Sequence, residues 1–110
     1  MLWRYPKGYT AVAISSDIGL REQALGIKSE RGILAIVGCS HPGVDSLLES
    51  LNYFGHVYGV IGGFHGFSDI DYLESLELVI PTHCTRKRGE ILKRLGSKAM
   101  AAGAGFRMEI

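Results

Sequence analysis

Apolar residues along this chain fall into short continuous runs that are separated by amphipathic segments. Runs of this kind occupy residues 32–37, 57–62 and 76–80, and each is followed within a few residues by a histidine. An apolar, β-branched run without polar alternation is typical of a strand that is covered on both faces. The pattern therefore predicts three buried strands, each with a histidine beyond its carboxyl end.

An amphipathic segment follows each run and predicts a helix. Apolar residues recur at helical spacing over residues 44–54, and Pro42 just before them suits the first position of a helix, so we expect the helix to open there. A short helix with a weak capping-box pattern at residues 68–71 is expected after the second run. A longer helix over residues 86–95, capped by Thr85, is expected after the third.

Strand propensity also marks residues 9–15 and 23–28. A turn lies between the second of these segments and the first buried run, which predicts an antiparallel hairpin of residues 23–28 with 33–38. The tail over residues 99–110 is expected to finish as a strand. Alternating strands and helices predict one α/β domain over residues 1–110, with βαβ units in the sheet.

Right-handed crossovers bring the carboxyl ends of parallel strands to one edge of a sheet, where ligands bind. The residues expected to gather there are Cys39, His41, His65, His83 and Cys84. Imidazole is a common metal ligand, and three protein ligands with one open position are typical of a catalytic zinc site. Taken singly, each could instead be a hydrogen-bonded loop histidine or an inert buried cysteine. His56 precedes its strand and is expected at the opposite edge.

A run of hydroxyl and basic residues follows the third histidine, namely Thr85, Arg86, Lys87 and Arg88. Basic side chains at a helix start oppose the helix dipole, which favours an anion bound among the cations and the free N–H groups. A phosphate or a carboxylate would suit such a site. A solvated surface run is the alternative.

Composition narrows the function classes. The chain has 110 residues, of which 46% are apolar and 21% charged, as in an ordinary globular domain. A net charge of +1 gives no reason to expect nucleic acid. No window approaches the ~18–20 apolar residues of a membrane span, and the first residues lack a signal-peptide core. We therefore expect a cytoplasmic protein whose two cysteines are thiols of a site.

Four ordered motifs resemble the carboxyl-terminal half of metallo-β-lactamase-fold hydrolases of the dihydropterin (methanopterin-precursor) synthase-like subgroup. They are Gly-Cys-Ser-His-Pro-Gly at 38–43, Gly-Gly-Phe-His at 62–65, Pro-Thr-His-Cys-Thr at 81–85 and Gly-Ala-Gly at 103–105, and Glu-Gln-Ala-Leu at 22–25 also fits. The resemblance implies half of an αββα sandwich, a mixed sheet with helices on one face. It also implies one or two zinc, iron or manganese ions at the edge between two such halves.

The resemblance assigns roles to the rim residues. It implies that His83 corresponds to the last metal-ligand histidine and that His41 lies in a motif that supplies another ligand. His65 is expected to line the same site as a ligand or as a catalytic acid or base. Cys39 stands where many superfamily members place a bridging aspartate, and we include it among the candidate metal ligands.

One part of the family pattern does not occur in this sequence. The principal metal motif, H-x-H-x-D-H, belongs to the amino-terminal half and is absent from these 110 residues. We therefore expect a hydrolase half that acts on a small phosphate-bearing ester when a separate amino-terminal polypeptide completes it. The alternative is a truncated, non-catalytic homodimer with a vestigial metal or anion site. A small anion-binding module built on the helix after Thr85 is a third interpretation.

Overall fold

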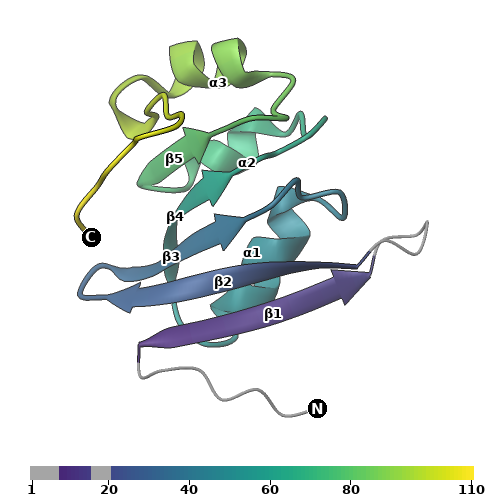
Figure 1. The fold of residues 1–110 in the computed structure, drawn as a ribbon, viewed down its shortest axis with the longest axis vertical. Helices are drawn as coiled ribbons and strands as arrows, with labels where there is room; N and C mark the ends of the chain where they lie inside the picture. Colours follow the sequence, from purple (N-terminus) through teal and green to yellow (C-terminus); the bar gives the residue numbers. More distant parts are fainter. Residues whose placement is uncertain (1–7, 16–20) are drawn as a thin grey trace.

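The computed structural model of this protein describes residues 8–15 and 21–110, and all statements below concern these ranges. Five strands form one mixed sheet in the order β1-β2-β3-β4-β5 (Figure 1). The strands are β1 (Tyr9–Ser15), β2 (Arg21–Ser29), β3 (Gly32–Val37), β4 (Val57–Gly62) and β5 (Leu78–Pro81). The helices are α1 (Val44–Asn52), α2 (Ile70–Glu74) and α3 (Arg88–Leu95), and α3 is followed by the short 3-10 helix η1 (Gly96–Lys98).

The first two strand pairs are antiparallel and the last two are parallel. β2 and β3 form the predicted hairpin, in which Lys28 faces Ile33 across the turn. The β3–β4 and β4–β5 pairs are parallel and are connected through α1 and α2, as the βαβ pattern predicts. His56 lies beside the beginning of β3, where its carbonyl accepts a 2.7 Å hydrogen bond from the Ile33 N–H. It is therefore at the opposite edge from the carboxyl ends of the parallel strands, as expected.

All three helices pack on one face of the sheet through a single apolar core. The core residues are Ala24, Ile33, Ala35, Val37, Val57, Val60 and Val79 of the strands, Phe64 of the loop after β4, Val44, Leu47, Leu48 and Leu51 of α1, Ile70 and Leu73 of α2, Leu76 of the turn after α2, and Ile91 and Leu95 of α3. Fully burying one such aliphatic side chain stabilises the fold by about 1.5–3 kcal/mol. The residues at helical spacing and the residues of the apolar runs thus pack into the same core.

The other face of the sheet carries a row of apolar side chains that no helix within residues 8–15 and 21–110 covers. The strand register aligns Leu25 of β2, Ile36 of β3 and Ile61 of β4 across this face. Ile36 is 38% exposed. Near Ile61, Phe106 of the C-terminal tail helps to line a hollow. We call the Leu25, Ile36 and Ile61 row the open face.

Two expected helix starts are wrong. α1 opens at Val44 rather than at Pro42, because Gly43 is its N-cap with φ 109°, a conformation that suits glycine and breaks the helix there. α3 begins at Arg88, and Thr85 does not cap it. The Thr85 hydroxyl is instead buried and accepts a 3.0 Å hydrogen bond from the Phe64 N–H. Because this tertiary contact engages the hydroxyl, it does not cap the helix.

The expected C-terminal strand is also wrong. Beyond η1, the tail pairs with β5 only through an isolated bridge between Val79 and Ala99, with a 3.1 Å hydrogen bond from the Met100 N–H to the Val79 carbonyl. A turn then closes from Gly103 to Phe106, and Gly105 within it has φ 86°. The extended pairing that the apolar content of the tail suggested therefore stops near Ala99, and the turn at these glycines follows it.

Candidate metal centre

The predicted site residues lie on three loops at the carboxyl ends of β3, β4 and β5, an edge that we call the rim. Backbone hydrogen bonds tie these loops to one another. The Gly63 N–H donates to the Gly38 carbonyl at 2.7 Å, and the Thr82 N–H donates to the Gly62 carbonyl at 2.8 Å. The Arg86 N–H donates to the His65 carbonyl at 2.9 Å. Parallel pairing and these loop contacts therefore bring to one edge side chains that lie more than forty residues apart in the sequence.

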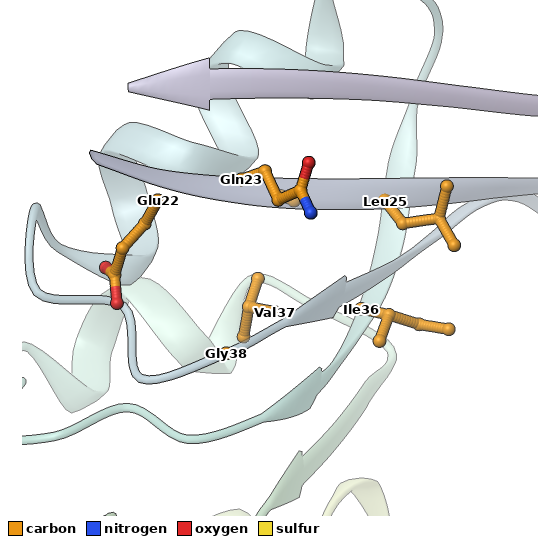
Figure 2. A pocket seen from close by; sticks show the side chains of 7 residues that line it. Glu22, Gln23, Leu25, Ile36, Val37 and Gly38 are labelled. Carbon is orange, nitrogen blue, oxygen red and sulfur yellow. The ribbon is translucent and has the colours of Figure 1, made fainter. Parts of the chain in front are cut away.

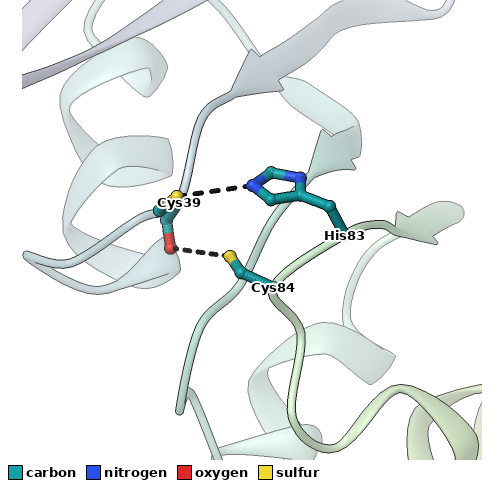
Figure 3. Close-up of side chains that lie close together, drawn as sticks. All are labelled: Cys39, His83 and Cys84. Atoms are coloured by element: carbon teal, nitrogen blue, oxygen red, sulfur yellow. Dashed lines mark hydrogen bonds between the residues drawn. The ribbon is translucent and has the colours of Figure 1, made fainter.

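Cys39, His83 and Cys84 form the first of two clusters at the rim (Figure 3). The Cys39 Sγ lies 3.3 Å from the His83 Nε2, and the Cys84 Sγ lies 3.9 Å from the Cys39 carbonyl oxygen. The three potential ligand atoms are all within 4.8 Å of one another. The other ring nitrogen of His83, Nδ1, lies 3.1 Å from the Thr82 hydroxyl. This cluster brings two thiols and one imidazole to a common point.

Gly63 leaves the space that this cluster occupies. A Cβ atom at this position would lie 2.5 Å from the Cys84 Sγ and 2.7 Å from the His83 Cε1. It would also lie 2.7 Å from the carbonyl oxygen of Gly38. Real Cβ contacts are longer than this, so any side chain at residue 63 would push the cluster apart.

Glu22, Cys39 and His41 form the second cluster. The Glu22 Oε1 lies 2.8 Å from the His41 Nδ1, and the other carboxylate oxygen accepts a hydrogen bond from the His41 N–H. The ring of His65 lies against that of His41, with 4.7 Å between the ring centroids. Cys39 belongs to both clusters, so the rim holds one continuous group of potential ligands.

Glu22 is a site residue that sequence reasoning did not single out, although it lies in the motif at residues 22–25. Its side chain is only 16% exposed. The predicted hairpin could have identified it, because antiparallel pairing of β2 with β3 places the beginning of β2 beside the end of β3, where Cys39 and His41 follow. The carboxylate fixes both the backbone and the ring of His41.

The Cys39 thiol is held in its neutral form. A hydrogen bond with Cys84 is the main cause that raises the pKa of Cys39 above its ordinary value, and burial, the electrostatic influence of Cys84 and the charge of Glu22 act in the same direction. Without a cation at the rim, Cys39 is therefore a thiol at neutral pH. A bound cation would reverse this preference, because metal ligation requires the thiolate.

Backbone strain is concentrated in the loops of the rim. Ser40 and His65 are the non-glycine residues with positive φ in the described ranges, at 59° and 46°. The Ser40 hydroxyl is buried and has no hydrogen-bond partner among the described residues. Conformations of this kind cost about 1–3 kcal/mol each and are typical of functional loops.

In the predicted anion-binding run, Thr85 to Arg88, two members are engaged with other residues and one lines a hollow beside His83. The Thr85 hydroxyl is engaged with the backbone of Phe64, and Lys87 lies 3.7 Å from the carboxylate of Glu90. Arg88, by contrast, lines a hollow of about 450 Å³ together with Thr82 and His83. Anion binding by this run stays a prediction, and Arg88 is the member that shares a hollow with His83 of the first cluster.

A second hollow, of about 490 Å³, opens between the diverging ends of β2 and β3 (Figure 2). Its lining residues are Glu22, Gln23, Ala24, Leu25, Ile36, Val37 and Gly38. Glu22 therefore belongs to the second cluster and also lines this hollow. An apolar wall made by Leu25 and Ile36 thus continues the open face up to the rim.

The donors at the rim suit a transition metal. Imidazole and thiolate together are typical of zinc, and the short Cys39–His83 separation is compatible with two ligands of one ion. Of the predicted ligands, the structure brings His83 together with Cys39 in the first cluster, and it places His41 with Glu22 in the second. The ring of His65 lies against that of His41. The individual roles of His41, His65, His83 and Cys39 stay predictions.

Comparison with known proteins finds relatives that are longer than this chain, whereas no family model matches it. The 7,8-dihydropterin-6-methyl-4-(beta-D-ribofuranosyl)-aminobenzene-5'-phosphate synthase of Methanocaldococcus jannaschii is 36% identical over 93 residues, which cover 80% of this chain and 28% of the synthase. An uncharacterized protein of the same organism is 41% identical over 64 residues, which cover 50% of this chain and 25% of that protein. The chain thus spans about a quarter of the length of these curated relatives.

One solved structure extends the comparison to the fold. A metal-dependent hydrolase of the β-lactamase superfamily matches with a TM-score of 0.81 and 26% sequence identity, covering 98% of this chain and 56% of the hydrolase. No helix in the described ranges has the length and apolarity that a membrane crossing requires.

Proposed function

Because this chain is homologous to part of that synthase and has part of the metallo-β-lactamase fold, we propose that it contributes the rim of a metal-dependent hydrolase active site. The observation that supports this most is the continuous group of ligand-type side chains at the carboxyl ends of β3, β4 and β5, with Cys39 common to both clusters. Ligands are expected at this edge of an α/β sheet. Alignment of a metal-dependent hydrolase over nearly the whole chain gives the chemistry a precedent.

The residues have the following roles in this proposal. His83 and Cys39 hold a metal ion, and His41, oriented by Glu22, supplies a ligand to the same ion or to a second one. His65, which lies against His41, is a further ligand or the group that moves a proton. Zinc is the ion that suits these donors best, with iron or manganese as the alternatives, and when bound it acts as a Lewis acid that lowers the pKa of an attached water.

We propose a small phosphate-bearing ester as the substrate. Arg88 lines the same hollow as His83, so a phosphate held by its guanidinium would lie close to the metal cluster. Arg86 and Lys87 add positive charge to the same loop. The dihydropterin synthase among the relatives carries a 5'-phosphate in the name of its product, which agrees with this substrate class.

A second structural unit is expected to complete the site. The matching hydrolase is longer than this chain, which covers 56% of it, and the open face of the sheet presents apolar side chains that a partner would cover. We propose that this unit carries the H-x-H-x-D-H motif that the printed sequence lacks. Free thiols at the rim suit a reducing compartment, and we therefore place the assembly in the cytoplasm.

The test combines this chain with a polypeptide that carries the H-x-H-x-D-H half. The purified complex is analysed for metal and assayed for hydrolysis of bis(p-nitrophenyl) phosphate. We expect bound metal and activity, both of which His83→Ala abolishes. His56→Ala, at the other edge of the sheet, is the matched control and leaves both unchanged. A complex without metal and without activity would contradict the proposal.

The open face also supports a second candidate, in which two copies of this chain pair and no catalysis occurs. Ile36 is at the centre of this face and is partly exposed, and a second copy would bury it. Size-exclusion chromatography with light scattering distinguishes the two functions, because this candidate requires a dimer of the isolated chain that Ile36→Glu converts to a monomer. A stable monomeric wild-type chain would exclude the homodimer.

A further inference from the structure

We propose that Cys39, His83 and Cys84 form a thiolate-rich zinc site on this chain, with a fourth coordination position left open. The inference rests on the proposed function for the location of a metal at the rim, and it adds Cys84 as a ligand, which no family resemblance assigned. Two cysteines and one histidine with an open position are a known donor set of catalytic zinc sites. Each step below concerns the geometry of these three side chains.

The separation of the ligand atoms matches one shared ion. Zinc–sulfur bonds of about 2.3 Å and zinc–nitrogen bonds of about 2.0–2.1 Å at tetrahedral angles place a sulfur and a nitrogen ligand about 3.6 Å apart, and two sulfurs about 3.8 Å apart. The Cys39 Sγ and the His83 Nε2 are 3.3 Å apart, and all three ligand atoms lie within 4.8 Å of one another. Side-chain adjustments of less than about 1 Å therefore close the site.

The surroundings of His83 favour ligation through Nε2. Nδ1 lies 3.1 Å from the Thr82 hydroxyl, so a proton on Nδ1 has an acceptor there. Nε2 is then the unprotonated nitrogen, and it is the one that faces the Cys39 sulfur. Metal-bound histidines commonly direct their second nitrogen to such a partner, which fixes the ring and its tautomer. Thr82 is thus a positioning residue of this site.

The cluster is compact because of a glycine beside it, and its three side chains are open to solvent. The Cβ-free position at Gly63 accommodates the Cys84 sulfur and the His83 ring, since a Cβ there would lie 2.5 Å and 2.7 Å from them. His83 is exposed, and both cysteines are only half-buried, so an ion can reach all three donors. Thiolates favour zinc over manganese and magnesium, which prefer oxygen ligands.

Cobalt(II) reports the ligands directly and is the probe of choice. The full chain is purified under argon with a phosphine reductant and titrated with Co²⁺. We expect one ion per chain with intense sulfur-to-cobalt charge-transfer absorption, and Zn²⁺ should displace the cobalt whereas Mn²⁺ in excess should not. Cys84→Ser should remove about half of the charge-transfer intensity, and Thr82→Val should weaken binding about 10- to 100-fold. His56→Ala should change neither quantity.

The proposal is overturned if cobalt binds without charge-transfer absorption, or if Cys84→Ser leaves that absorption unchanged. It is also overturned if the fully reduced protein binds no ion. A measurement on the wild-type chain does not depend on whether the variants fold. Bound Zn²⁺ should slow alkylation of both Cys39 and Cys84 by iodoacetamide at least tenfold, as followed by peptide mass spectrometry. Equal alkylation rates with and without Zn²⁺ would refute the site.

Failure of this inference and failure of the proposed function can be distinguished. A completed complex that hydrolyses phosphate esters but shows no thiolate–metal absorption would retain the hydrolase and exclude both Cys39 and Cys84 as ligands. Thiolate–metal absorption in a complex without hydrolytic activity would retain the site and exclude the hydrolase. The two readouts are independent because the first reports bonds to sulfur and the second reports turnover.

Discussion

Replacing Gly63 by alanine tests whether the rim is as closely packed as the structure shows. The added Cβ atom would meet the Cys84 sulfur at 2.5 Å, and the Gly38 carbonyl oxygen and the His83 Cε1 at 2.7 Å each. The Gly38 oxygen cannot withdraw freely, because it accepts a 2.7 Å hydrogen bond from the Gly63 N–H itself. The loops after β3, β4 and β5 must therefore separate to accept one methyl group.

The magnitude follows from the cost of overpacking a tight site. Inserting a methyl group into a well-packed region costs about 1–3 kcal/mol of the free energy of unfolding. Taking about 2 kcal/mol and an m-value of about 2 kcal/mol/M for a small domain, the urea midpoint should fall by about 1 M. Zinc binding should weaken as well, because Cys84 and His83 move apart, by about tenfold for each 1.4 kcal/mol of lost interaction.

Gly66→Ala is the matched control, three residues away on the same loop. A Cβ atom at Gly66 would meet nothing within 4 Å, so the substitution should change the free energy of unfolding by less than about 0.5 kcal/mol. The assay is urea unfolding followed by circular dichroism, with a zinc titration of each variant. The reasoning is refuted if Gly63→Ala unfolds at the same urea concentration as Gly66→Ala and binds zinc equally well.

Three further predictions concern the parts of the fold that support the rim. Glu22→Gln removes the charge that holds His41, and urea unfolding should show a loss of about 1–3 kcal/mol. Leu47→Ala leaves a cavity under α1, where the leucine is fully buried, and should cost about 2–5 kcal/mol by the same assay. Burial, and then the charges of Glu49 and Asp45, raise the pKa of Tyr72 above its ordinary value, so the fold favours the neutral phenol. The stabilisation that this gives is fully present below about pH 10 and is lost as the pH rises through the pKa of the folded state, so stability curves against pH for wild type and Tyr72→Phe should diverge above pH 10.

Each of these has its own check. Glu30→Gln, in the exposed turn between β2 and β3, should leave stability unchanged, and an equal loss in both glutamine variants would contradict the Glu22 prediction. Glu49→Ala, on the exposed side of α1, should change stability by less than about 0.5 kcal/mol, in contrast to Leu47→Ala. Parallel pH curves for wild type and Tyr72→Phe would show that the phenol titrates alike in the folded and unfolded chain.

The pattern of apolar residues predicted strands and helices correctly where burial of their side chains dominates the local energetics. The uninterrupted apolar runs of β3 and β4 and the helical spacing of Val44, Leu47 and Leu51 identified elements whose buried faces form the core. Burial of these side chains is the largest local contribution, so the elements could be predicted from neighbours in the sequence alone. The same holds for the hairpin of β2 with β3, where a short turn leaves little choice of partner.

Capping and termination were predicted less well, because competing partners lie far away in the sequence. Thr85 has the residue type of a helix cap, but its hydroxyl is engaged by the Phe64 N–H from the loop after β4. The tail has enough apolar residues for a strand, yet its pairing ends near Ala99, before the turn at Gly103. In both places a tertiary contact or a turn decided between local alternatives that the sequence leaves nearly equal in energy.

The sequence by itself determined which side chains reach the rim, since a histidine or cysteine placed just after a parallel strand must emerge at the carboxyl edge of the sheet. Only the tertiary structure decided how they group there. It separated the three histidines into a pair, His41 with His65, and a third, His83, which lies with Cys39 and Cys84. The order of strands fixes an edge, whereas distances of 3–5 Å between side chains depend on loop conformation, on the space left at Gly63 and on a carboxylate from β2, and these arise only when the whole sheet is assembled.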